Sequence, residues 1–250
     1  MIHKTYIKTP ENARQAVLML HGICGTPHHF DFLLPLFDDS WAVYNILLSG
    51  HGGTVQDFSR ANMQTWKAQV TEYLDLLSSQ YDRILVVGHS MGTLLLQQVL
   101  SCYPKIIGAV MLNVPMYPQL HPKLIPVMLR AAFGQLRDDR PVDRFFQQAS
   151  SIRLSKNLLL YLGWIPRFWE LLTLCAQCRK TAAPLPVPTL VVFGSKDELV
   201  CLRSKKFFEN DPSARTVIFE NTGHFGFYPM DQNKLCTMVQ QLLQEVCDRV

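Results

Sequence analysis

The sequence predicts an α/β fold in which helices flank a mostly parallel sheet. Along its 250 residues, short continuous apolar runs rich in β-branched residues alternate with longer amphipathic stretches. Such runs are typical of strands buried on both faces of a parallel sheet, and the alternation of strand with helix is typical of a doubly wound fold. A third observation is a block without strand-like runs, from about 115 to 188, which prolines bracket at both ends.

Six segments have the length and apolar character of buried strands: 16–20, 42–48, 84–87, 107–112, 189–193 and 215–219. Three longer segments are predicted helices: 62–79, 91–102 and 231–250. In the last of these, Leu235, Val239 and Leu242 recur at helical spacing. Because a single α/β domain commonly reaches about 200–250 residues, we expect residues 1–250 to form one domain.

The block from about 115 to 188 is predicted to be a helical insertion. Its segments 124–133, 141–150 and 158–174 each have the composition of a short helix. A loop of this length without secondary structure would be unusual in a compact domain. We therefore expect a helical cap, or lid, carried by the main domain.

Composition excludes several classes of protein. With 48% hydrophobic and 18% charged residues, the chain is not a disordered or low-complexity protein. A net charge of +4 without a basic run gives no indication of nucleic-acid binding. The seven cysteines are an odd number, so we expect reduced thiols and a cytoplasmic location, with Cys175 and Cys178 on one turn of a helix. No stretch of 18 uninterrupted apolar residues occurs, so stable membrane insertion is not expected, and the oligomeric state stays open.

The strongest motif is Gly88-His89-Ser90-Met91-Gly92, which lies between a predicted strand and a predicted helix. A serine on such a sharp strand-to-helix turn is exposed for reaction, and glycines two positions away on either side relieve crowding. The helix N-terminus directs amide hydrogens towards the same place and favours negative charge there. Ser90 is therefore the candidate nucleophile.

A serine nucleophile needs a base, and the base needs an orienting acid. In this strand–turn–helix arrangement the chain order is Ser, Asp or Glu, then His. His224 is the single histidine after position 121, so it is the candidate base. Asp197 follows the strand at 189–193 and is the preferred acid. Glu198 is its competitor, since the side chains of neighbouring residues usually point apart.

The loop His21-Gly22-Ile23-Cys24-Gly25 follows the first buried strand, where a backbone amide could complete an oxyanion hole with the amide of Met91. The remaining loop histidines are expected to brace their loops by hydrogen bonds. The adjacent His28 and His29 are not expected to bind a metal.

Together with Gly50-His51-Gly52 and Trp66, these motifs resemble the α/β-hydrolase family, and within it the bacterial carboxylesterase and monoacylglycerol lipase branch. The resemblance covers nearly the whole chain outside 115–188. It implies an α/β-hydrolase fold, a triad of Ser90, Asp197 and His224, and an oxyanion hole formed by the amides of Ile23 and Met91. One departure is Thr93, where many relatives carry a second glycine.

The chemistry predicted is hydrolysis of carboxylic esters with a short or medium acyl chain, or of a monoacylglycerol-like ester, without a cofactor. Alternatives that keep the triad are a thioesterase, a C–C bond hydrolase or lyase, and a peptidase; a non-catalytic ligand-binding protein is less expected because the triad residues are all present. The aromatic residues Trp164, Phe168 and Trp169 in the insertion are expected to line the substrate pocket.

Overall fold

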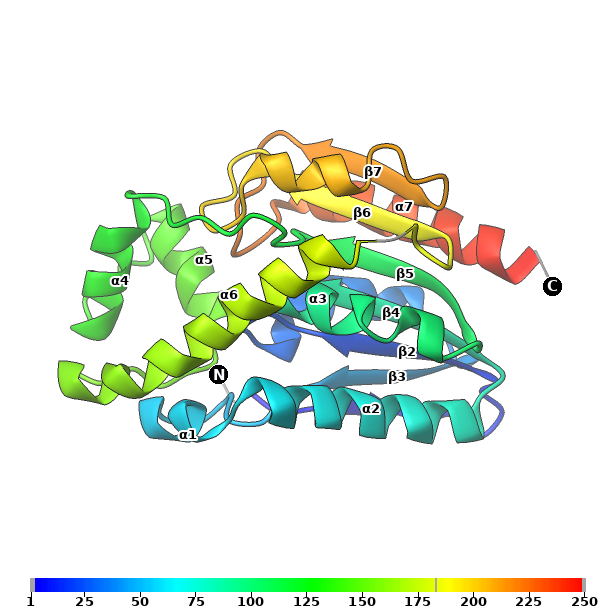
Figure 1. Ribbon diagram of the computed structural model, residues 1–250, viewed down its shortest axis with the longest axis horizontal. Coiled ribbons are helices and arrows are strands. Elements are labelled where there is room, and N and C mark those ends of the chain that lie inside the picture. Colours follow the sequence, from blue (N-terminus) through cyan, green and yellow to red (C-terminus); the bar gives the residue numbers. More distant parts are fainter. Residues whose placement is uncertain (1–2, 183, 249–250) are drawn as a thin grey trace.

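One sheet organises the chain in the computed structural model, which describes residues 3–182 and 184–248. Seven strands follow one another across it in the order β1-β3-β2-β4-β5-β6-β7 (Figure 1). Every neighbouring pair is parallel except β1 with β3. The strands are β1 (Tyr6–Lys8), β2 (Gln15–Leu20), β3 (Trp41–Ile46), β4 (Arg83–His89), β5 (Ile106–Leu112), β6 (Thr189–Gly194) and β7 (Ala214–Phe219).

The six predicted strands are confirmed, with small shifts at their ends. The prediction missed β1, which is three residues long and pairs with the edge strand β3. Two of its three residues are exposed, so it shows no apolar run. Its pairing partner, rather than its own composition, makes it a strand.

Alternate residues of the inner strands β2 to β6 enter two separate cores. Ala16, Leu18 and Leu20 of β2 belong to one buried cluster, and Val17 and Met19 belong to the other. The first cluster includes residues of α1 (Val55–Arg60), α2 (Met63–Gln80), α3 (Met91–Gln97) and α6 (Ile165–Lys180). The second includes residues of the 3-10 helix η1 (Pro27–Leu36) and of α7 (Pro229–Asp248). The inner strands β2 to β6 are largely apolar because both faces of the sheet are covered there, as Figure 1 shows.

The predicted helices are largely confirmed. The helix expected at 62–79 is α2, with Asn62 accepting a hydrogen bond from the Thr65 N–H at its N-terminus. The helix expected at 91–102 ends at Gln97 and is followed by a 3-10 turn, η2 (Leu100–Cys102). In the helix expected at 231–250, α7 covers the residues up to Asp248, and 249–250 lie outside the described residues.

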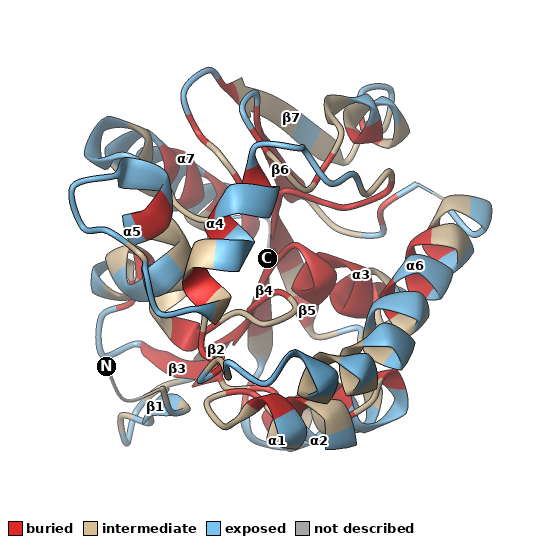
Figure 2. Cartoon of the chain, turned by 90° about the vertical axis from the view of Figure 1, so that its left-hand side faces the viewer, coloured by how far each residue is buried: buried red, intermediate tan, exposed pale blue. Residues whose placement is uncertain are grey.

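The segment between β5 and β6 is helical, as predicted for 115–188. It contains α4 (Leu124–Ala132), α5 (Pro141–Ala149), the 3-10 helix η3 (Leu158–Trp164) and α6. Figure 2 shows α4, α5 and α6 around the end of the sheet where β4 and β5 finish. After β6, the 3-10 helix η4 (Leu202–Phe207) leads to β7.

The longest part of the cap is the segment Leu158–Lys180, formed by η3 and α6. By length and composition it could cross a membrane, a point that the count of uninterrupted apolar residues did not reveal. Its outer side is exposed (Figure 2), including Leu159, Ile165 and Trp169. Its other side supplies Leu174, Cys175 and Cys178 to the core beside α3, so the two cysteines share a buried helical turn as predicted.

Candidate active site

The candidate oxyanion loop and the candidate nucleophile lie at the point where the order of the strands reverses, next to β2. From β2 the chain moves to β3 on one side, whereas β4 pairs with the other side of β2. Parallel sheets form a crevice at such a switch point, beyond the carboxyl ends of the strands. Gly22 and Ile23 follow β2, and Ser90 follows β4. The topology therefore brings the oxyanion loop and the candidate nucleophile together.

Ser90 has the strained backbone that its motif predicts. Its φ is 50° and its ψ is −122°, while its N–H donates to the Leu112 carbonyl over 2.9 Å. The next turn approaches β2 so closely that a Cβ on Gly92 would lie 2.1 Å from the Leu20 oxygen. Thr93 is fully buried, and its hydroxyl donates to the Ser90 carbonyl over 2.6 Å. The threonine that departs from the family pattern thus supports the serine turn.

His224 and Asp197 form a buried pair. Nδ1 of His224 lies 2.9 Å from Oδ2 and 3.0 Å from Oδ1 of Asp197. The same carboxylate accepts the N–H groups of Leu199 and Val200, at 2.8 and 2.7 Å. Because an ionised carboxylate can only accept, Nδ1 carries the proton and Nε2 is left to accept one. The structure thus places Asp197 at the histidine ring. Glu198, its competitor, instead accepts the backbone N–H of His224.

The His224 loop is also connected directly to the serine turn. Nε2 of His89, the residue before Ser90, lies 3.1 Å from the His224 carbonyl and donates to it. The two imidazole centroids are 4.8 Å apart. Within residues 3–182 and 184–248, Ser90 and the His224 ring share no direct hydrogen bond. Catalytic hydrogen bonds of this type commonly tighten only when substrate binds.

Two histidines brace the oxyanion loop, as expected from the sequence. His51 Nε2 accepts the Cys24 N–H at 3.0 Å, and His21 Nε2 accepts the Leu48 N–H, also at 3.0 Å. Burial lowers the pKa of His51 to about 4 and that of His21 well below its usual 6.5. Both rings are therefore neutral acceptors at neutral pH. Cys24 needs this support because its φ is 56°, a left-handed conformation that is unusual for a residue other than glycine.

The two candidate oxyanion donors lie beside this loop and at the start of α3. Ile23 lines a cavity together with Gly22, Cys24 and His224. Met91 is the first residue of α3, directly after Ser90. Across the described part of the chain, neither backbone N–H of these two residues makes a hydrogen bond to another protein group. Both amides therefore remain able to bind a negatively charged oxygen.

The cavity at His224 is small, about 60 Å³, and the cap closes one side of it. Phe146 and Ala149 of α5 form that side, and Leu199 and Phe225 contribute from the acid and histidine loops. Phe146 and Phe225 were not among the residues predicted to line the pocket. Neither stands in an apolar run, so only the packing of α5 against the 224–226 loop reveals them.

The aromatic residues predicted to line the substrate pocket stand apart from the small cavity at His224. Trp164 packs on Phe58 at 4.9 Å between ring centroids and donates from Nε1 to the Val55 carbonyl. Trp169 is 71% exposed and Phe168 is 39% exposed. None of the three lines the cavity at His224. In this arrangement Trp164 attaches the cap to α1, and the other two face outwards.

Among the described residues, no three His, Cys, Asp or Glu side chains are grouped so that they could hold a metal ion. His28 instead contacts Asp31, with 2.8 Å between Nδ1 and Oδ2. His29 stacks on His89 with ring centroids 3.8 Å apart. Burial, with a smaller contribution from His224, lowers the pKa of His29 to about 3.

Comparisons with known proteins agree with this architecture. The chain is 34% identical over 104 residues to a thermostable monoacylglycerol lipase of Bacillus sp. (strain H-257), a match that spans 41% of this chain and 42% of that relative's length. It is 21% identical to a putative 2-succinyl-6-hydroxy-2,4-cyclohexadiene-1-carboxylate synthase of Bacillus subtilis (strain 168), over 85% of both chains.

Solved structures share the fold at low identity. The crystal structure of the monoacylglycerol lipase of Paleococcus ferrophilus superposes with a TM-score of 0.68 at 18% identity, covering 97% of this chain and 99% of that one. A structure from a study of the metagenome-derived lipolytic enzymes LipS and LipT superposes with a TM-score of 0.73 at 18% identity, over 98% of both chains. The model of the alpha/beta hydrolase family matches residues 17–235. The chain therefore belongs to the α/β-hydrolase family.

Proposed function

We propose that this protein is a serine hydrolase that cleaves carboxylic esters. The observation that carries the proposal is the buried pair of Asp197 and the His224 ring beside the strained turn of Ser90. A fold by itself does not determine a reaction, because many chemistries share it. The named lipases and esterases among the similar proteins support ester hydrolysis over other acyl transfers.

In the proposed mechanism, Oγ of Ser90 attacks the ester carbonyl carbon while Nε2 of His224 takes the hydroxyl proton. The Nδ1–H of His224 donates to Asp197, which orients the ring and stabilises its cation. The imidazolium then protonates the leaving alkoxide, and the acyl group stays on Ser90. A water molecule, deprotonated by His224, attacks this acyl-enzyme and releases the carboxylic acid and the free serine.

Negative charge develops on the carbonyl oxygen in both steps. The Ile23 and Met91 amides are the proposed donors to it, held by the bracing of Cys24 and by the start of α3. Each preorganised donor of this kind contributes about 3–4 kcal/mol to stabilisation of the transition state.

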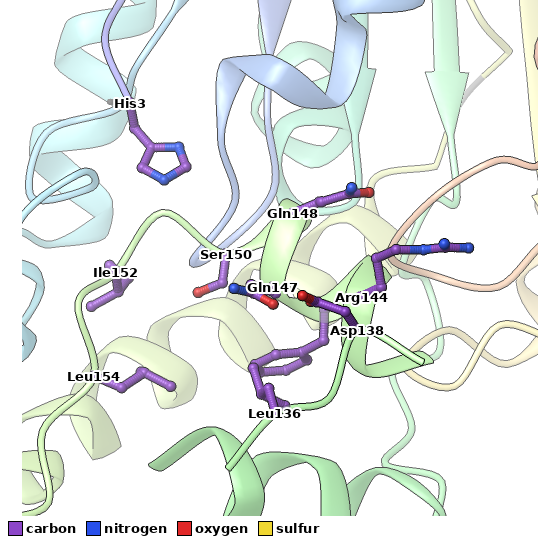
Figure 3. A pocket seen from close by; sticks show the side chains of 10 residues that line it. His3, Leu136, Asp138, Arg144, Gln147, Gln148, Ser150, Ile152 and Leu154 are labelled. Atoms are coloured by element: carbon purple, nitrogen blue, oxygen red, sulfur yellow. The ribbon is translucent and has the colours of Figure 1, made fainter. Parts of the chain in front are cut away.

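The shape of the cavities indicates where the rest of the substrate lies. The cavity of about 60 Å³ at His224 is well below the roughly 300–1,000 Å³ usual for ligand pockets. A second cavity, of about 520 Å³, adjoins the cap, and Phe146 and Ser150 line both. Ile152 and Leu154 form an apolar side of the larger cavity, whereas Gln147 and Arg144 lie on its other side (Figure 3).

We therefore propose that the smaller cavity receives the reacting carbonyl and a short acyl group, and that a medium acyl chain, as in a monoacylglycerol, extends past Phe146 along the apolar side of the larger one. This places the acyl chain against α5, not against Trp164, Phe168 and Trp169. A thioesterase, a C–C bond hydrolase and a peptidase would use the same three residues.

A substrate panel tests the proposal. Wild-type protein and the Ser90→Ala variant would be assayed on p-nitrophenyl esters of increasing acyl length, on a monoacylglycerol, on acyl thioesters and on aminoacyl amides. Ester hydrolysis should exceed the other activities and fall by about 10⁶ in kcat for Ser90→Ala. Ser101→Ala, at an exposed serine, is the control and should retain full activity. Ester turnover within about tenfold of wild type in Ser90→Ala would exclude the mechanism.

A further inference from the structure

We propose that Glu198 is a positioning residue that holds the backbone of His224 while Asp197 holds its ring. The inference rests on the proposed function, in which His224 is the base. Oε2 of Glu198 accepts the His224 N–H over 2.9 Å. Two adjacent carboxylates therefore accept hydrogen bonds from one histidine: Asp197 from Nδ1–H of the ring and Glu198 from the backbone N–H.

Neighbouring side chains reach the same residue because the backbone turns between them. The Asp197 carboxylate accepts the N–H groups of Leu199 and Val200, which closes a tight turn around Glu198. This turn carries the Glu198 side chain to the 223–224 loop instead of directing it away from Asp197. The expectation that only one of the two acids can face His224 holds for an extended strand, not for this turn.

Gly223 provides the space that the Glu198 carboxylate occupies. A Cβ at Gly223 would lie 3.0 Å from Oε2 and 3.2 Å from Oε1 of Glu198. Contacts of 3.0–3.4 Å are tighter than nine in ten real Cβ contacts. Glycine in the sequence Gly223-His224 is therefore matched to the carboxylate across from it, an observation independent of the hydrogen bond itself.

The main chain of Glu198 is fixed from the opposite side. Its carbonyl accepts the His121 N–H over 2.9 Å, and the Leu199 carbonyl accepts the Gln119 N–H over 2.8 Å. The ladder continues with an antiparallel bridge between Pro118 and Val200. The start of the cap, at residues 118–121, thus fixes the backbone of residues 198–200. The half-buried Glu198 side chain therefore holds the His224 loop from a fixed position.

A carboxylate acceptor makes a stronger hydrogen bond to a backbone N–H than a neutral oxygen does. Placing the imidazole correctly matters, because a shift of about 1 Å in a reacting group can cost about 10²-fold in rate. Glu198 touches neither Ser90 nor the reacting atoms. Its removal should therefore lower kcat and leave KM nearly unchanged.

Three variants test this role. Glu198→Ala should lower kcat for p-nitrophenyl acetate by about 10- to 100-fold, with KM within about twofold of wild type. Glu198→Gln keeps an oxygen acceptor and should recover most of the lost activity. Glu170→Ala is the matched control. Glu170 lies in α6 of the cap, is also half-buried, and its Oε2 accepts the Met63 N–H over 2.9 Å. It should keep wild-type kcat.

Amide hydrogen exchange gives a readout that does not require turnover. The His224 N–H should lose at least about tenfold of its protection in Glu198→Ala, keep it in Glu198→Gln and keep it in Glu170→Ala. Should the wild-type protein hydrolyse no ester, the proposed function fails, while exchange at His224 still decides whether Glu198 holds it. Unchanged exchange at His224 in Glu198→Ala, or lost protection with kcat within twofold of wild type, would overturn the positioning role.

Discussion

The rings of Phe146 and Phe225 meet edge to face, with 5.2 Å between their centroids. Phe146 belongs to α5 of the cap, whereas Phe225 follows the candidate base His224. Both line the small cavity at His224, and Phe146 also lines the larger one. The cap and the loop that carries His224 are thus joined by an aromatic contact at the wall between the two cavities.

Replacing Phe146 should change selectivity for acyl length. In Phe146→Ala the two cavities join, so kcat/KM for the p-nitrophenyl decanoate should rise relative to the acetate by about tenfold, equivalent to burial of roughly two methylene groups. Phe145→Ala is the control, because Phe145 packs on Tyr228 with 5.2 Å between ring centroids and does not line either cavity. If the ratio of kcat/KM for decanoate to that for acetate changed equally in both variants, loosening of the cap, and not the Phe146 side chain between the cavities, would set the selectivity.

Asp197 should be far more sensitive than Glu198. Asp197→Asn keeps the size of the side chain but loses the charge that orients the His224 ring, so kcat should fall by about 10⁴. Steady-state kinetics with a short-chain ester would measure this loss of kcat, and a circular dichroism spectrum would check that the variant is folded. A loss of kcat smaller than tenfold would contradict the assignment of Asp197 as the acid that orients His224.

The pH dependence of stability should report on the braced histidines. Burial lowers the pKa of His51 from 6.5 to about 4. Between these values the unfolded chain binds more protons than the folded one, so stability is fully present above pH 6.5 and falls as the pH drops towards 4. His51 alone should remove roughly 2 kcal/mol from the free energy of unfolding between pH 7.5 and 5.

Urea unfolding at both pH values checks this expectation. His51→Gln keeps an acceptor for the Cys24 N–H but removes the ionisation, so its stability should change less with pH than that of the wild type. His121→Gln, at an exposed histidine, should behave as the wild type does. Equal pH dependence in all three proteins would show that protonation of His51 is not coupled to unfolding.

The cap depends on a buried ion pair between α4 and α5. Arg130 donates to Asp143, which is 1% exposed and also accepts the Arg137 N–H over 3.2 Å. Arg130→Ala leaves this carboxylate without its cation and should destabilise the cap. Arg137→Ala breaks an exposed pair with Asp139 and should destabilise the cap much less than Arg130→Ala does. Limited trypsinolysis should cut the cap of the first variant much faster; equal rates would contradict the assignment.

Cys24 should resist alkylation despite lining the cavity at His224. Burial raises the pKa of its thiol to about 12, so very little reactive thiolate exists at pH 8. Mass spectrometry after treatment with iodoacetamide should find label on the exposed Cys102 before Cys24. Rapid labelling of Cys24 with loss of activity would show that the oxyanion loop opens in solution.

Much of the scaffold could be predicted from local patterns. The sequence segments that form β2, β4 and β5 are apolar at nearly every position, because both faces of these strands are covered. Ser90 could be predicted as the nucleophile because its motif lies between a strand and a helix, and His224 as the base because no other histidine follows position 121. These features depend on short stretches of sequence and on chain order.

Local patterns and chain order therefore predict the strands of the sheet, the strained turn at Ser90 and His224 as the candidate base. Tertiary structure alone decided which aromatic residues reach the cavity: Trp164 packs on α1, while Phe146 packs on Phe225. It also decided that Asp197 and Glu198 both reach His224, because the turn at Leu199 and Val200 brings the second carboxylate to the main chain. The physical reason is that these contacts join residues far apart along the chain, through cap packing and loop closure, and leave no periodic pattern in the sequence.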